Sequence, residues 1–142
     1  MKPAILVAFG LSFASAIVLG QGQGNTITAQ IVIGPGSDGA CVVTTSPADI
    51  HSAKRNYKIR WDVTNNCDGT RTVTVGNFKH ENDENRRKDP IRIDKVDNVA
   101  SNGTGVIEGR IKGIKDEDLG TYKYDVLIDG VVAVDPKIDI DG

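Results

Sequence analysis

The 142-residue chain is poor in the residues that carry most protein chemistry. It contains two histidines, two cysteines, one methionine and one tryptophan, which is too few for most metalloenzymes. Its single tryptophan and three tyrosines make a poor platform for sugars, because a hydrophobic core uses most of them. The formal net charge of −2 argues against a general nucleic-acid binder. With 39% hydrophobic and 25% charged residues, the composition is that of one globular domain.

The N-terminus has the pattern of a secretory signal peptide. Lys2 precedes an apolar stretch at residues 4–13, and small residues follow at positions 14–16 and at Gly20, as a signal peptidase requires. We therefore expect a signal peptide at residues 1–20, ending no later than residue 24, and a single domain at residues 25–142. The open alternative is an uncleaved anchor, because the apolar stretch is about as long as a short membrane span. The expected location is secreted or periplasmic.

The only two cysteines are Cys41 and Cys67. An oxidising compartment favours a disulfide between them, and closing a loop of this length stabilises a fold by roughly 3.5 kcal/mol in the chain-entropy model. The alternative is a reactive thiol, which needs a neighbouring base. Neither His51 nor His80 is close to a cysteine in sequence, so the structural disulfide is the favoured interpretation.

The domain shows the two-residue period of half-buried strands, with apolar side chains on one face and polar ones on the other. This alternation occurs at residues 27–33, 57–63, 72–75, 91–93, 122–128 and 137–140. Turn residues separate these runs, and Asp129-Gly130 is typical of a two-residue hairpin. Only residues 115–119 suggest a helical turn. About seven short strands with regular turns predict an all-β Greek-key sandwich.

The segment at residues 80–90, HENDENRRKDP, has no apolar residue before Pro90, which predicts an exposed loop. Its His80, Arg86, Arg87 and Lys88 form a candidate loop for binding a partner, because clustered cations can hold a phosphate or a carboxylate. The alternative is a solvated loop tip, since four acidic residues lie in the same segment. If the loop binds a partner, deleting residues 81–88 weakens binding and leaves folding intact.

Two segments resemble the second half of a cupredoxin domain. The first is KIRWDVTNN at residues 58–66, followed by VTV at 73–75; the second is DLGTYKYDV at residues 118–126, followed by DPKIDI at 135–140. The second segment also resembles the tyrosine corner of an immunoglobulin-like domain, which is the alternative fold. Either resemblance implies a structural core that includes Trp61, Tyr122 and Tyr124, with the Tyr122 hydroxyl bonded to backbone at the corner.

The resemblance to cupredoxins does not extend to the copper ligands. A blue-copper site needs two histidines and a cysteine, often with an axial methionine. After His80 the chain has no histidine, cysteine or methionine. The cupredoxin cysteine would fall near Val126, and no residue there can bind copper as that cysteine does. No catalytic triad, zinc motif or phosphate-binding loop occurs either. We expect no cofactor, no metal site and no catalytic residues.

The sequence therefore predicts an exported, non-enzymatic β-sandwich domain that acts as a binding or structural module. The partner class is a protein or a cell-surface component, with sheet edges and the loop at residues 80–90 as candidate surfaces. Nucleic acid is not expected, and membrane contact is expected only if the N-terminal segment stays uncleaved. Two alternatives stay open. One is a metal-handling protein for copper or calcium, or an electron-transfer protein of the cupredoxin type. The other is a secreted hydrolase with a carboxylate of raised pKa.

Overall fold

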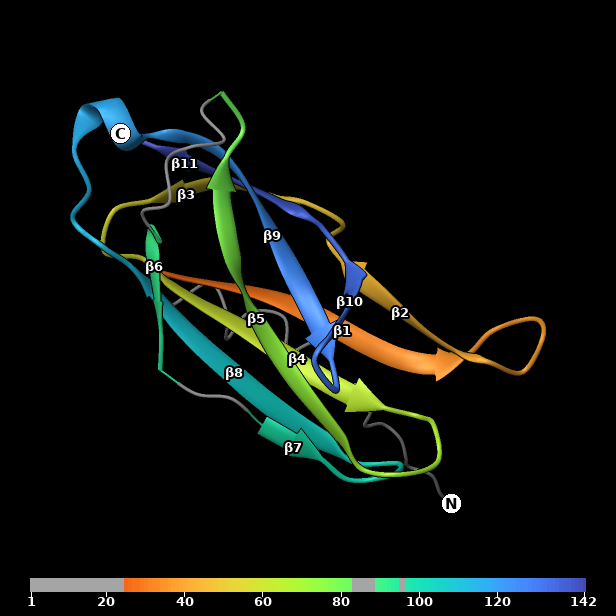
Figure 1. Cartoon of the computed structure of the whole chain (residues 1–142). Helices are drawn as coiled ribbons and strands as arrows, with labels where there is room; N and C mark the ends of the chain where they lie inside the picture. Colours follow the sequence, from red (N-terminus) through yellow and green to blue (C-terminus); the bar gives the residue numbers. More distant parts are fainter. Residues whose placement is uncertain (1–24, 83–88, 95–96) are drawn as a thin grey trace, which may run out of the picture.

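The computed structural model describes residues 25–82, 89–94 and 97–142. These residues form two β-sheets that pack face to face, with a single turn of 3-10 helix, η2 (Asp116–Asp118), between strands (Figure 1). The all-β sandwich predicted from the alternating sequence is confirmed. No helix within the described residues is long and apolar enough to cross a membrane.

The first sheet has five strands in the order β2-β1-β4-β8-β6. Its long strands are β1 (Thr26–Pro35), β4 (Lys58–Asn65) and β8 (Thr104–Ile111), and its edges are β2 (Cys41–Ser46) and β6 (Ile91–Ile93). Strands β1 and β4 run parallel, whereas the other neighbours are antiparallel. Strand β2 therefore lies at one lateral edge of the sandwich and pairs, within the described residues, with β1 alone.

The second sheet has six strands, five of them in the order β3-β11-β9-β5-β7. They are β3 (Ile50–Lys54), β11 (Lys137–Asp141), β9 (Gly120–Ile128), β5 (Arg71–His80) and β7 (Asp97–Val99). The sixth strand, β10 (Val131–Val134), pairs with the last residues of β9. Strand β11 pairs with the first residues of β9. Strands β11 and β10 therefore lie one after the other along the same side of β9. The lateral edge beside β2 thus has two halves, one formed by β10 and one by β3 and β11 (Figure 1).

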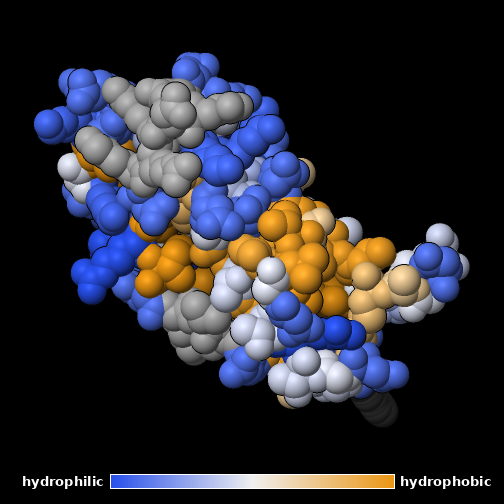
Figure 2. All heavy atoms as spheres, viewed as in Figure 1, coloured by the Kyte–Doolittle hydropathy of each residue, from blue (hydrophilic) through white to orange (hydrophobic). Residues whose placement is uncertain are grey.

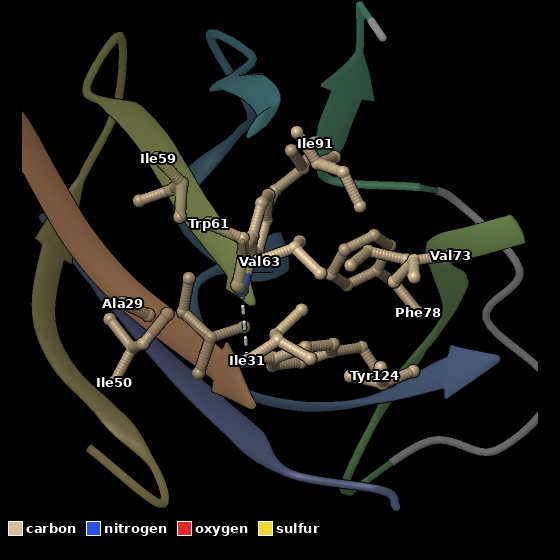
Figure 3. Close-up of a cluster of buried hydrophobic side chains, with 14 of the residues drawn as sticks. Ala29, Ile31, Ile50, Ile59, Trp61, Val63, Val73, Phe78, Ile91 and Tyr124 are labelled. Atoms are coloured by element: carbon tan, nitrogen blue, oxygen red, sulfur yellow. Dashed lines mark hydrogen bonds between the residues drawn. The ribbon is translucent and has the colours of Figure 1, made fainter. Parts of the chain in front are cut away.

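The core lies between the sheets and is built around Trp61. Its indole N–H donates to the Tyr124 hydroxyl at 3.3 Å, and the two rings meet edge to face with centroids 5.9 Å apart. Phe78 stacks on Tyr124 with centroids 5.4 Å apart, and isoleucines and valines of both sheets fill the space around them (Figure 3). Burial raises the pKa of Tyr124 to about 12. Every one of these side chains comes from an alternating strand position.

Tyr122 forms the corner expected of it. Its buried hydroxyl donates to the backbone carbonyl of Asp118 at 2.5 Å, across the turn formed by η2. The Asp129-Gly130 hairpin is also present: both residues have positive φ, 52° and 83°, and they join β9 to β10. The described residues hold eleven strands, more than the expected seven, because β2, β3, β7, β8 and β10 lack a clear alternation of apolar and polar residues.

The first and last strands begin and end beside one short turn. Thr26 of β1 is level with Lys58 at the start of β4, and Asp141 of β11 is level with Lys54 at the end of β3. The backbone N–H of Tyr57 bonds to the carbonyl of Lys54 at 3.1 Å, which closes that turn. Both boundaries of the sandwich therefore lie at the end opposite the β9–β10 hairpin.

Candidate functional site

The predicted disulfide between Cys41 and Cys67 is present. Cys41 is the exposed first residue of edge strand β2, and Cys67 is buried in the connection from β4 to β5. The bond ties the free edge of the first sheet to the interior at one end of the sandwich. Neither cysteine is a free thiol.

Arg71 lies beside the disulfide and connects three segments. Its guanidinium donates to the Asp129 carboxylate and to the Asp68 carbonyl, both at 3.3 Å, and approaches the Cys41 sulfur at 3.9 Å. Asp129 also accepts the backbone N–H of Thr72 at 2.9 Å. The Thr72 N–H and then Arg71 hold the pKa of Asp129 below its ordinary value. The arginine charge is thus balanced by an ionised carboxylate.

An apolar groove of about 400 Å³ runs between β2 and β10. Among the described residues, Arg71 is the one charged side chain that lines it. The remaining lining residues are Ile33, Cys41, Val42, Val43, Ile128, Val131, Val132 and Ala133. Val42, Val131 and Val132 are 47%, 69% and 51% exposed, and they are the exposed large hydrophobic residues of the described chain. Figure 2 shows hydrophobic atoms gathered over β10 and the neighbouring β2.

The other half of the same lateral edge carries polar contacts. The His51 ring bonds through Nδ1 to one oxygen of Asp139 at 2.6 Å, and the Thr121 hydroxyl donates to the other oxygen at 2.5 Å. These hydrogen bonds, that from Thr121 first, hold the pKa of Asp139 below its ordinary value. A register shift against β11 and the positive φ of Ser52, 60°, mark a bulge in β3. Bulges of this kind redirect side chains and interrupt pairing at an edge.

The structure places His80 in β5, not in the loop that the sequence predicted. It is 7% exposed, its Nε2 donates to the Leu119 carbonyl at 2.9 Å, and its Nδ1 accepts the backbone N–H of Asn82 at 3.1 Å. The physical reason is a register shift between Gly76 and Lys79, which reverses the alternation and turns His80 inward. The other residues of the candidate loop, Arg86, Arg87 and Lys88, lie outside the described residues.

The residues with metal-ligating side chains are dispersed. Within residues 25–82, 89–94 and 97–142, no three His, Cys, Asp or Glu side chains come close enough together to hold a metal ion. A polar hollow of about 540 Å³ lies over the outer face of β4 and β8. The charged residues that line it are Arg60 and Asp62, which pair at 2.7 Å and neutralise each other. The groove between β2 and β10 is therefore the best-formed candidate for a binding site.

Known structures share this fold at low sequence identity. A CupB2 chaperone from Pseudomonas aeruginosa matches with a TM-score of 0.50 and 11% identity, over 66% of this chain and 52% of that one. A copper-containing nitrite reductase from Thermus scotoductus, a cupredoxin-fold protein, matches with a TM-score of 0.50 and 14% identity, over 88% of this chain and 33% of that one. These matches support a cupredoxin-like β-sandwich, and the chain spans about half and about a third of these two proteins.

No protein-family model matches the chain. No curated protein matches its sequence either. The two structural matches described above, at 11% and 14% identity, show the fold alone.

The groove was missed in the sequence because its walls are about 90 residues apart along the chain. One signal was available. Residues 25–48 contain a single charged side chain, Asp38, and residues 130–134 contain none. In a chain in which a quarter of the residues are charged, two stretches with so little charge, each containing an edge strand, indicate a surface with few charged side chains.

Proposed function

We propose that the chain is an exported, non-enzymatic β-sandwich module that binds a protein partner through its lateral edge at β2 and β10. The observation that carries the proposal is the apolar groove between these strands, beside an edge strand that pairs on one side only. The disulfide supports an oxidising location, secreted or periplasmic, because such bonds persist there and are rare in the cytosol.

Edge strands normally carry features that prevent pairing with other chains. Charged side chains, inward-pointing lysines, bulges and prolines are the usual ones. Strand β2 has no charged residue and no internal proline, and its side chains alternate between exposed and partly buried. A partner strand added along β2 would take up the backbone groups of that edge, while the groove would receive its alternate side chains.

The chemistry of the groove selects an uncharged, extended partner segment. The cation that lines it in the described part of the chain, Arg71, is already paired with Asp129, so an acidic ligand would gain little from it. Val42, Val131 and Val132 offer apolar area, and covering such area contributes roughly 25 cal/mol per Å² before the costs of association. A β-branched or apolar residue at alternate positions of the partner strand fits this surface.

The test uses a blocked, uncharged peptide of alternating valine and threonine, carrying a soluble polyethylene glycol tail. Titration into isotope-labelled protein should shift the backbone amide signals of β2 and β10 saturably in NMR spectra, because the peptide pairs with that edge. The matched control is the same peptide with N-methylated amides at every second residue, which cannot complete the backbone hydrogen bonds. No binding by the unmodified peptide, or signal changes confined to other strands, would contradict the proposal.

A further inference from the structure

We propose that the segment that pairs with β2 is β2 of a second copy of this chain, so that two molecules form an antiparallel dimer with a continuous sheet. The inference rests on the proposed function, because it names the partner of the same edge. It follows from the charge of the edge, from the symmetry of strand pairing and from the location of the exposed hydrophobic residues.

The charge distribution favours a like partner. A dimer with a two-fold axis places the same surface against itself, so each charged residue near the axis meets its own copy. Strands β1, β2 and β10 contain no charged residue, and the charge of Arg71 behind them is balanced by Asp129. The net charge of the whole chain, −2, adds little repulsion between copies. The two β2 strands therefore meet without like charges along their length.

The pairing geometry is antiparallel by symmetry. A two-fold axis perpendicular to the sheet makes β2 of one copy antiparallel to β2 of the other, which is the same relation that β2 has to β1. With the axis at Val43, Val42 of each copy lies opposite Thr44 of the other. β-Branched residues in such cross-strand pairs stabilise a sheet by roughly 0.2–1 kcal/mol each. Five of the six residues of β2 are valine, threonine or serine, so small register shifts keep compatible pairs.

The exposed hydrophobic residues coincide with the same edge. Val42, Val131 and Val132 are the large hydrophobic side chains that stand exposed in the described chain, and all three line the one groove. A second β2 strand beside the first would extend over this groove and cover side chains of β10. Exposed apolar residues concentrated in one place mark an interaction surface. A six-residue strand buries a modest area, so we expect a dimer that dissociates on dilution.

The experiment is sedimentation velocity on the disulfide-bonded chain, from about 5 to about 500 µM, over which a weak dimer changes its populated fraction. The wild type should pass from monomer to dimer within this range. Thr44→Lys should raise the dissociation constant at least about tenfold. The two lysines would be diagonal neighbours across the axis, with their Cα atoms about 7–8 Å apart, and their charges would repel each other. Thr44 is exposed, so the substitution should not prevent folding. Thr104→Lys, at an exposed site on β8 of the same sheet, is the matched control and should dimerise like the wild type.

Two results would overturn the inference. One is a wild-type chain that stays monomeric at the highest concentration, and the other is a dimer that Thr44→Lys leaves unchanged. The peptide titration separates this failure from failure of the proposed function. A monomeric chain whose β2 signals shift with the peptide keeps the edge as a binding site for another protein. A monomer whose β2 amides resist hydrogen exchange and bind no peptide has an edge already covered by its own residues, and both proposals then fail.

Discussion

The lateral edge of the sandwich has two halves with opposite chemistry. The half at β3 and β11 carries the Asp139 carboxylate, which accepts hydrogen bonds from Thr121 and His51, and a bulge in the outermost strand. The half at β2 and β10 carries no charged residue in either strand and exposes three valines. Both halves belong to the same sandwich, and they differ in their side chains and in the regularity of the outermost strand.

This difference indicates which half of the edge is protected from pairing with a strand of another chain. Charges and bulges at an edge oppose the addition of another strand, and the β3 half has both. Strand β2 has neither, although the same chain supplies many charged residues elsewhere; the register shift of this half lies in β10, between Val132 and Val134. An unprotected edge of this kind is either a hazard for aggregation or an interface, and the disulfide that fixes its end to the interior is consistent with an interface of defined shape.

The largest effect should come from removing the disulfide. Replacing both cysteines, Cys41→Ala with Cys67→Ala, should lower the free energy of unfolding by about 2–4 kcal/mol, because the unfolded chain loses its constraint. The loss should be uneven: amide exchange in β2 should accelerate far more than in β11. Urea denaturation gives the first quantity and hydrogen exchange the second. An equal acceleration in both strands would show that the bond does not specifically hold the β2 half.

A smaller effect should follow from the tyrosine corner at the opposite end. Tyr122→Phe removes the hydroxyl that donates to the buried carbonyl of Asp118 and should lower the free energy of unfolding by about 1–2 kcal/mol. Tyr57→Phe is the control, at a half-buried tyrosine, and should change stability by less than about 0.5 kcal/mol. The measurement is the midpoint of thermal unfolding of the two variants. Equal midpoints would show that the hydroxyl at the corner does not stabilise the fold.

The smallest effect should be a change in acid sensitivity at the β3 half. Because hydrogen bonds lower the pKa of Asp139 below its ordinary value of 3.8, its ionised form stabilises the folded state above about pH 4. That stabilisation is lost as the pH falls through the lowered value. Asp139→Asn should therefore cost under about 1 kcal/mol at neutral pH and flatten the loss of stability in acid.

Urea denaturation at a series of pH values measures the effect of Asp139→Asn. His51→Gln should give a smaller change, since the Thr121 hydrogen bond contributes more to lowering the pKa of Asp139 than His51 does. If the variant and the wild type lose stability in parallel as the pH falls, the carboxylate does not contribute in this way.

Strands could be predicted from the sequence where one face of the strand is buried and the other is exposed, because their residues then alternate between apolar and polar. Strands β4 and β9 alternate cleanly, so Trp61, Tyr122 and Tyr124 could be named in advance. Strand β8 was missed because Gly109 stands at an inward position, where the Ile91 side chain lies 2.8 Å from the place of a Cβ atom. A position filled by a neighbour's side chain leaves no apolar residue in the pattern.

The candidate site was harder to predict than the fold. The residues of strand β2, CVVTTS, do not alternate between apolar and polar types, and the bulge in β3 breaks the period at Ser52. His80 was expected in a loop because sequence does not reveal a register shift two residues earlier. The pairing of two distant uncharged stretches into one groove depends on sheet order, which local patterns do not specify.

The short turn between β3 and β4 lies beside both boundaries of the sandwich, so the chain could be circularly permuted. The boundaries of the sandwich lie on either side of this turn, beside Lys54 and Lys58, so a brief linker from residue 142 to residue 25 would close the backbone into a ring without disturbing either sheet. New ends could then be opened at an exposed loop elsewhere. The order of the strands along the chain could thus be changed without changing how they pack. A protein fused at either original boundary would be attached at the end of the domain far from the groove.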